Sequence, residues 1–203
     1  MTYDTAVSPA MVPRKEVPLF LYVALFFLLV CINALVAKFV VFSFGLAPGA
    51  STIYLVVALM VVFTLWFGMY GAVAAYLGCF IGAGILGGIS PEVSLYWSLA
   101  DFWEVLIPLV AFRYFAADPA LKSWRDLGVL LVFGILINNL AGAAWGSLAL
   151  AAGGLIPWTG IVPVFFIWAA GNILICLILI PAILSLFTPA VQDHELFVRR
   201  YWE

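Results

Sequence analysis

Apolar residues along this chain form long runs, separated by short stretches rich in glycine, proline or charge. Six runs predict helices, at about 17–41, 52–66, a third run ending near 86, then 94–113, 127–152 and 161–186. A span of the hydrocarbon core needs about 20 residues. The pattern therefore predicts an all-α integral membrane protein, a bundle of six transmembrane helices.

The polar segments at the two ends mark the predicted domain limits. Residues 1–16 form an N-terminal tail, 17–187 the six-helix transmembrane domain and 188–203 a C-terminal tail. The first apolar run is long and lacks a small-residue cleavage site, so it is interpreted as a retained span and not a signal peptide. With six spans and short connections, no separate soluble domain is expected.

Composition supports a membrane protein and excludes several other classes. The chain is 67% hydrophobic and 9% charged, with a mean hydropathy of +1.23, whereas an ordinary soluble domain is about 25% charged. We expect a multi-pass protein of the cell membrane. A net charge of −2 with scattered basic residues argues against nucleic acid as a partner. All three cysteines lie in apolar runs, so no disulfide framework is predicted.

The basic residues predict the orientation in the membrane. Six spans would place seven of the eight Lys and Arg side chains on one side: Arg14, Lys15, Arg113, Lys122, Arg125, Arg199 and Arg200. Because basic residues concentrate in cytoplasmic connections, both termini are predicted to be cytoplasmic. The eighth basic residue, Lys38, lies near the outer end of the first predicted span.

The segment SLYWSLADFWEVLIPLVAFR, residues 94–113, places two acids inside an apolar run. Asp101 and Glu104 are three residues apart and so share one helix face. Trp97 and Pro108 extend the same face. Carboxylates in a span face the protein interior or a wet cavity and usually mark a ligand site or pathway. This face is therefore predicted to be the wall of a cavity.

Other spans contribute polar or aromatic groups at similar depths. The predicted ligand-binding residues are Glu104, Asp101, Asn172, Asn139, Asn138, Trp97, Trp168 and Lys38. Alternatives remain for several of them. Asparagines in spans also bond between helices, the lysine side chain could extend to the outer interface, and tryptophans could pack or lie at the interface.

Small residues form a stripe along the third predicted helix. Gly71, Ala75, Gly78 and Gly82 recur at spacings of four, three and four. Such stripes let helix backbones approach closely. One interpretation is a docking face for a partner protein, and the other is packing against a neighbouring helix of the same chain.

Catalytic signatures are missing from the sequence. H-E-x-x-H, G-x-S-x-G, a Walker loop and Cys/His metal spacing do not occur. We therefore expect no enzyme activity, no metal and no cofactor. The single histidine, His194, has no companion with which to bind metal. A proton path would need ionisable groups at several depths, and below Glu104 the next is Arg113.

The stretch WSLADFWEVLIPLVAFRYF, followed by a basic connection and by WAAGNILICLILIPAIL, resembles the membrane-associated sensor domain of bacterial histidine kinases and cyclic-di-GMP enzymes. In that family an Asn-x-x-Glu span and a Trp-x-x-Gly-Asp span ending in Pro are typical. Glu104, Trp168, Gly171 and Pro181 match. The remaining two positions differ: Asp101 stands where Asn is usual, and Asn172 where Asp is usual.

The segment WFGMYGAVAAYLGCFIGAG, residues 66–84, is similar to the substrate-capture (S) components of energy-coupling-factor transporters. That resemblance implies six spans, cytoplasmic termini and a small molecule bound near the outer face. About 16 residues follow the last predicted span, whereas the sensor domain is normally followed by an output domain. Capture is therefore favoured over signalling.

Three hypotheses follow from the sequence. The first is a substrate-capture component that takes up a small molecule and works with membrane partner subunits. The second is a sensory or accessory membrane module that docks to partner proteins. The third is a fixed subunit of a larger membrane complex.

Overall fold

A computed structural model describes residues 17–42 and 53–202. The α-helices are α1 (Leu19–Phe39), α2 (Val56–Phe67), α3 (Met69–Cys79), α4 (Pro91–Trp97), α5 (Leu99–Tyr114), α6 (Trp124–Val129), α7 (Asn138–Ala152) and α8 (Ile161–Gln192). The chain also has two π-helical stretches and one 3₁₀ turn: η1 (Phe80–Ile85), η2 (Leu130–Ile137) and η3 (Trp158–Gly160). Two short strands, β1 (Val41–Phe42) and β2 (Ile53–Tyr54), pair antiparallel. The prediction of an all-α architecture is confirmed for these ranges.

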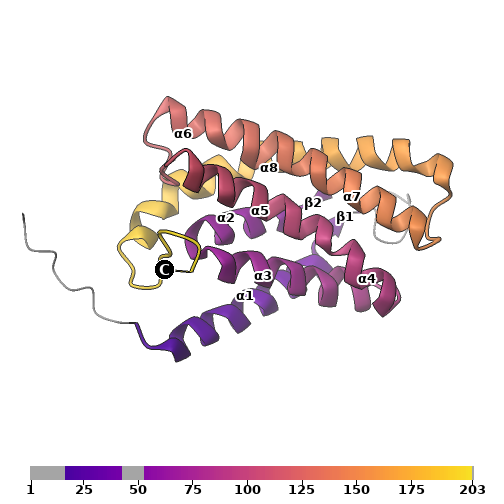
Figure 1. Ribbon diagram of the computed structural model, residues 1–203, viewed down its shortest axis with the longest axis horizontal. Coiled ribbons are helices and arrows are strands. Elements are labelled where there is room, and N and C mark those ends of the chain that lie inside the picture. The colour runs from indigo at the N-terminus through magenta and orange to yellow at the C-terminus, as the bar shows by residue number, and fades with distance from the viewer. Residues whose placement is uncertain (1–16, 43–52, 203) are drawn as a thin grey trace, which may run out of the picture.

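Several of these elements join end to end into rods that lie side by side (Figure 1). Four rods are long and apolar enough to cross a membrane: Leu19–Phe39, Pro91–Tyr114, Trp124–Ala152 and Trp158–Gln192. Two apolar helices, Val56–Phe67 and Met69–Ile85, are shorter. At 1.5 Å per residue, α2 is about 18 Å long, against about 30 Å of hydrocarbon. The long apolar helices support a membrane-embedded protein.

The helix limits differ from the predicted ones at three places. α2 begins at Val56, later than expected, because β2 occupies the residues before it. The helix before the acidic residues begins at Pro91, earlier than expected, where Ser90 caps its first turn and proline occupies the first helical position. α8 continues to Gln192 through Pro181 and Pro189, beyond the expected domain end at 187. Residues 1–16, predicted as a tail, lie outside the described ranges.

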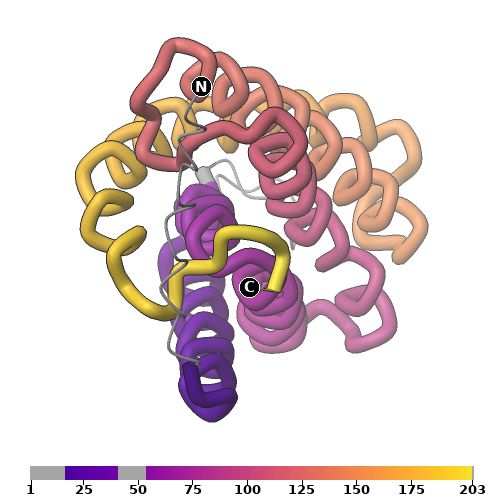
Figure 2. The backbone as a smooth tube through the Cα atoms, turned by 60° about the vertical axis from the view of Figure 1, so that its left-hand side comes forward, coloured from indigo at the N-terminus to yellow at the C-terminus, as the bar shows by residue number. Residues whose placement is uncertain are grey.

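α2 is the central helix of the bundle. Nine of its twelve residues are buried, and it packs against α3, α5 and α8. α1 is peripheral, with five buried residues of 21, and lies on the side of the bundle away from α7 and α8 (Figure 2). Large apolar side chains such as Phe27, Phe166 and Leu177 are exposed on the outer helices. An apolar exterior of this kind suits lipid and not water.

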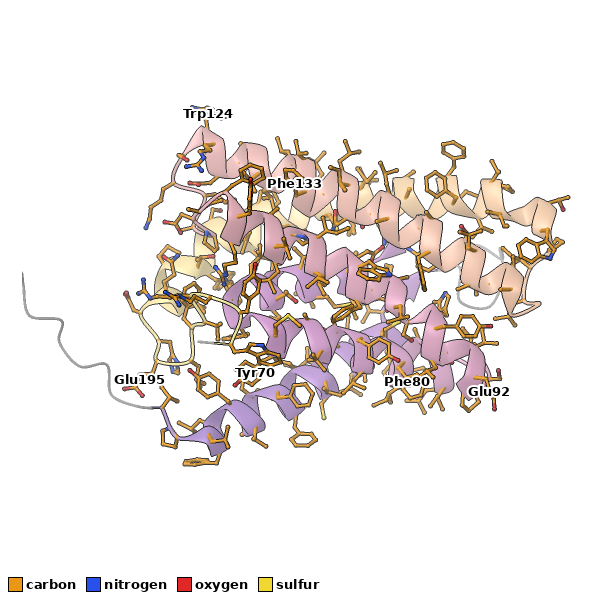
Figure 3. The ribbon with its side chains drawn as sticks, in the orientation of Figure 1. Tyr70, Phe80, Glu92, Trp124, Phe133 and Glu195 are labelled. Carbon is orange, nitrogen blue, oxygen red and sulfur yellow. The ribbon has the colours of Figure 1, made fainter. Side chains whose placement is uncertain are left out.

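One end of the bundle carries most of the described charge, and we call it the basic end. Arg113, Lys122, Arg125 and Arg199 lie in or beside the 115–123 connection and the C-terminal tail, which meet there. Figure 3 labels Trp124 and Glu195 at this end and Glu92 at the opposite end. The asymmetry agrees with the distribution that the sequence predicts for the cytoplasmic side.

The connection between α5 and α6 is stabilised by its own polar side chains. The Ser123 hydroxyl accepts from the Asp126 amide, and the Asp126 carboxylate accepts from the Ser123 amide, which makes a capping box. Partial burial opposes ionisation of Asp118, but hydrogen bonds from Ala120 N, Lys122 and Gln192 outweigh it and lower the pKa of this carboxyl. The network ties the connection to the end of α8.

A sharp break at Gly68 separates α2 from α3. Gly68 has φ +59° and ψ −136°, a conformation that essentially only glycine adopts. The C-terminal tail folds over this break: Val198 N donates to Trp66 O at 2.9 Å, and Met69 N donates to Tyr201 O at 2.7 Å. The tail thus supplies hydrogen-bond partners for backbone groups that have no intrahelical bond at the break.

Arg113, at the end of α5, fastens the tail in place. Its Nε donates to Arg200 O at 2.8 Å and its Nη2 donates to Val198 O at 2.7 Å. Val198 and Phe197 are buried. The Arg113 guanidinium is half-buried and bonds to backbone carbonyls of the tail.

Gly68→Ala tests the role of the break. A Cβ at Gly68 would overlap the Tyr201 carbonyl oxygen and lie 2.7 Å from Val198 Cγ1, at a strained φ. We expect a loss of about 1–3 kcal/mol in the free energy of unfolding, measured by thermal unfolding in detergent. Gly128→Ala is the matched control, because no atom lies within 4 Å of its Cβ position. Equal stability of the two variants would contradict this account.

Candidate ligand-binding site

Helix α5 carries both acids of the predicted cavity wall into the protein interior. Asp101 is 1% exposed and Glu104 is fully buried. Their spacing of three residues places them on the face of α5 that meets α2, α3 and α7. The prediction that the two acids share a protein-facing side is confirmed by this burial.

Asn172 of α8 contacts Glu104 directly. Asn172 Nδ2 donates to Glu104 Oε1 at 3.1 Å, and both side chains are fully buried. A hydrogen bond in a low-dielectric interior is electrostatically stronger than the same bond in water. This contact joins α5 to α8 through two residues that lie 68 positions apart in the sequence.

The two asparagines of α7 are buried and bond mainly to backbone carbonyls. Asn138 Nδ2 donates to Glu104 O at 3.0 Å. Asn139 Nδ2 donates to Ile135 O at 2.7 Å and to Asn138 Oδ1 at 3.2 Å. Asn138 therefore anchors α7 to α5, and the two amides have the interhelical and local bonding that the alternative interpretation of the sequence described.

Two tryptophans form an aromatic wall of the site. The Trp97 and Trp168 ring centroids are 6.1 Å apart at an interplanar angle of 53°, and both side chains are buried. Trp168 packs on Gly146 of α7, where a Cβ would overlap its six-membered ring. Neither indole N–H finds a hydrogen-bond partner in the described part of the chain.

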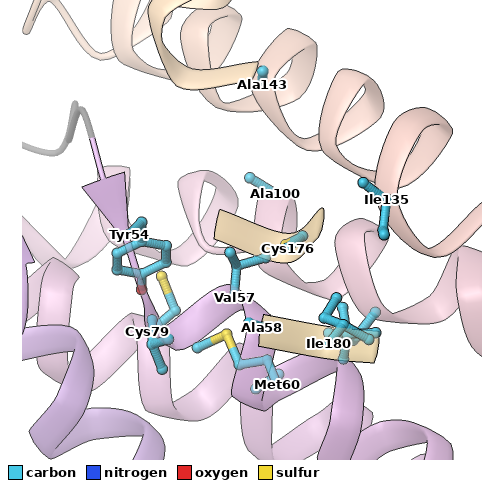
Figure 4. Packing of buried hydrophobic residues seen from close by; sticks show 14 of the residues in the cluster. Tyr54, Val57, Ala58, Met60, Cys79, Ala100, Ile135, Ala143, Cys176 and Ile180 are labelled. Carbon is cyan, nitrogen blue, oxygen red and sulfur yellow. The ribbon is translucent and has the colours of Figure 1, made fainter. Parts of the chain in front are cut away.

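Tyr54 and Cys79 lie on the other side of Asp101. Both side chains are buried and lie close to the Asp101 carboxylate, and Figure 4 shows the Tyr54 ring beside the Cys79 thiol. Tyr54 comes from β2, immediately before α2, and Cys79 from the end of α3. Neither was predicted as a site residue, because a tyrosine at a turn and a cysteine in an apolar run carry no signal of their own.

These side chains make up what we call the buried polar cluster: Tyr54, Cys79, Trp97, Asp101, Glu104, Asn138, Asn139, Trp168 and Asn172. Seven of its polar atoms have no hydrogen-bond partner within the described ranges: Asp101 Oδ1 and Oδ2, Glu104 Oε2, Asn172 Oδ1, Tyr54 Oη, Trp97 Nε1 and Trp168 Nε1. An unpaired buried polar atom costs about 1–3 kcal/mol. Asp101, Glu104 and Asn172 thus present acceptors for which the described residues supply no donor.

A close helix approach holds Glu104 in position. A Cβ at Gly142 of α7 would overlap Oε1, Cγ and Cδ of Glu104, so the carboxylate lies directly on the α7 backbone. The π-helical stretch η2 precedes Asn138, and π-helical turns often occur at functional sites. Neither the contact nor the π-turn could be read from the sequence.

Lys38 is the one predicted ligand residue that the structure leaves outside the cluster. Its side chain is exposed, and its Nζ donates to the carbonyl of Leu86, directly after η1. It fastens α1 to the turn after η1 and does not neutralise Asp101 or Glu104. Its place agrees with the alternative, extension toward the membrane interface.

The small-residue stripe packs within the chain, which corrects its assignment as a docking face. A Cβ at Gly78 or Gly82 would overlap Asn33 or Ala34 of α1, and one at Gly71 would meet the backbone of Phe63 and Thr64 in α2. Ala75 is buried in the same core. Because the helices of this chain cover the stripe, it offers no free face to a partner.

Comparison of this chain with known protein families, with curated proteins and with solved structures finds no match. The resemblances to the sensor domain and to the capture components stay predictions. The described residues contain no group of three or more His, Cys, Asp or Glu side chains that could hold a metal ion. The buried polar cluster is accordingly interpreted from its own geometry.

Gly142→Ala tests the close approach that positions Glu104. The added methyl would displace a buried carboxylate that bonds to Asn172, so we expect a loss of about 1–3 kcal/mol in the free energy of unfolding. Gly160→Ala is the control, because the nearest atoms to its Cβ lie at 3.6 Å, and its effect should stay within about 0.5 kcal/mol. If thermal unfolding finds both variants as stable as the parent protein, Glu104 does not pack on Gly142.

Proposed function

We propose that this chain is a multi-pass protein of the cell membrane that binds a small molecule in the buried polar cluster. In this proposal six helical rods cross the bilayer, with both termini in the cytoplasm. The protein serves as the substrate-capture component of an uptake system and passes its ligand to membrane partner subunits. The observation that carries the proposal is the set of seven unpaired polar atoms around Asp101, Glu104 and Asn172.

The depth of the cluster supports binding from the side opposite the basic end. Asp101 lies ten residues after Pro91, the start of its rod, which corresponds to about 15 Å along the helix. Asn172 lies eleven residues after Ile161, or about 17 Å. If the basic end faces the cytoplasm, the cluster occupies the outer half of the bilayer and extends to about its midplane.

The packing on the other side of the cluster supports capture over conduction. Toward the basic end, the helices contribute buried apolar side chains: Met60 and Leu65 from α2, Leu109 from α5, and Ile180 and Leu184 from α8. Figure 4 shows Met60 and Ile180 within this core. A ligand that enters the cluster from outside would meet an apolar barrier, so its release inward requires a rearrangement, which partner subunits would drive.

The membrane orientation is tested with a pair of exposed tryptophans. Trp158 lies in η3, opposite the basic end, and Trp124 begins α6 at the basic end; they are 67% and 87% exposed. In intact cells, a membrane-impermeant maleimide should label Trp158→Cys, and should label Trp124→Cys only after lysis. The protein without a new cysteine is the control, because any label it takes up must be on the native Cys31, Cys79 or Cys176. The reverse pattern, or labelling of both variants from outside, would contradict the proposed orientation.

Ligand binding is tested by native mass spectrometry of protein extracted in mild detergent. A non-lipid adduct of fixed mass should be retained by the parent protein and reduced about tenfold or more in Glu104→Gln, because loss of one charge-assisted hydrogen bond removes more than about 1.4 kcal/mol. Glu92→Gln is the matched control, since Glu92 is exposed at the start of α4. Its adduct should be unchanged.

The same measurement also distinguishes the competing hypotheses. Absence of any small-molecule adduct on the parent protein, or equal retention by Glu104→Gln, would remove the cluster as a binding site. Stable co-purification with a sensor kinase or an enzyme complex, without a small molecule, would favour the accessory module. Co-purification with an ATPase pair and a transmembrane coupling subunit would support capture.

A further inference from the structure

The charge balance of the buried polar cluster restricts the kind of molecule it can bind. Two carboxylates lie in its interior, and no basic side chain of the described ranges reaches them. Lys38 is exposed and bonds to Leu86 O, while Arg113 is occupied by carbonyls of the C-terminal tail. Buried charges are normally paired with opposite charge. The cluster lacks a resident cation.

The unpaired atoms of the cluster are mainly acceptors. Four of the seven are oxygens that accept: both carboxylate oxygens of Asp101, Glu104 Oε2 and Asn172 Oδ1. The resident amide donors are already used, since Asn172 Nδ2 donates to Glu104 and Asn138 Nδ2 donates to backbone. An alkylammonium group carries up to three N–H donors and no acceptor. It can donate to these four acceptors, whereas the other three atoms, Tyr54 Oη and the indole nitrogens of Trp97 and Trp168, are donors that it leaves without a partner.

The aromatic wall adds a second feature that suits a cation. The Trp97 and Trp168 rings are close together and buried, and indole is the ring that attracts cations most strongly. Trp168 packs on Gly146 and Glu104 packs on Gly142, one turn apart on α7, so the aromatic and acidic parts form one site. The cluster suits a divalent metal ion less well than an ammonium group, because the described residues offer no group of three His, Cys, Asp or Glu ligands.

We infer that the ligand of this site is a protonated amine with an apolar body. Its ammonium group donates to Asp101, Glu104 and Asn172, and its apolar part lies against Trp97 and Trp168. This inference rests on the proposed function, since it names the chemical class of the ligand bound there. In this inference the two acids and Asn172 select a positively charged head group, and the two tryptophans select an apolar body.

The test compares probes that differ only in the head group. 2-Phenylethylammonium, 2-phenylethanol and 3-phenylpropionate present a cation, a neutral hydroxyl and an anion on the same body. n-Butylammonium and n-butanol form a smaller pair. At pH 7, where alkylamines are protonated, each is titrated into the detergent-solubilised protein, with intrinsic tryptophan fluorescence and thermal unfolding as readouts. A ligand that binds the folded state raises its thermal stability.

We expect at least one ammonium probe to bind about tenfold or more tightly than its alcohol, and the carboxylate probe not to bind. Asp101→Asn and Glu104→Gln should each weaken ammonium binding about tenfold or more, and Glu92→Gln should leave it unchanged. If either cluster variant fails to fold, the comparison of charged and neutral probes on the parent protein still decides the matter. Equal or tighter binding of the alcohol or the carboxylate would overturn the inference.

Two further outcomes separate this inference from the proposed function. If no ammonium probe binds and native mass spectrometry finds a neutral or anionic molecule lost in Glu104→Gln, the ligand class is wrong but the binding function stands. The same holds if Na⁺ or Mg²⁺ stabilises the protein through Glu104 and amines do not. If no small molecule and no probe binds, both proposals fail.

Discussion

The hydrogen bond between Glu104 and Asn172 is the contact on which the interior arrangement depends. Hydrocarbon provides no partner for a carboxylate, so an acid within a span must find its partners inside the protein. Asn172 supplies one from α8, and the Asn138 amide ties the same turn of α5 to α7. Three helices are thereby held together around polar groups, and their apolar surfaces face outward.

Small residues make this arrangement sterically possible. Gly142 lets α7 approach the Glu104 side chain, and Gly146 accommodates the Trp168 ring. Across the bundle, Gly78 of α3 and Gly82 of η1 let these helices approach α1. Close helix packing therefore stabilises the fold through dispersion contacts, and the same glycines fix the positions of Glu104 and Trp168.

The centre and the basic end of the bundle are linked through the short helix α2. Its beginning adjoins Tyr54 at the buried polar cluster, and its end is covered by the C-terminal tail. Trp66 Nε1 donates to Thr188 Oγ1 at 2.9 Å, which joins α2 to α8 at the same end. A movement of the tail or of α8 would therefore reach α2, whose other end adjoins Tyr54 of the buried polar cluster.

The sequence by itself determined that the chain is helical, that its long apolar helices suit a membrane, and that Asp101 and Glu104 share one helix face. The long apolar helices can be read from the length and hydropathy of the runs, because a membrane span is a local property of the sequence. The shared face follows from helix geometry, because residues three apart lie on the same side of a helix. The sequence could not determine that Tyr54 and Cys79 lie beside Asp101, that Lys38 bonds to Leu86, or that the Gly78 and Gly82 stripe packs on α1. Those facts depend on which helices become neighbours, and only the tertiary structure decides that, because interhelical packing brings together residues far apart in the chain.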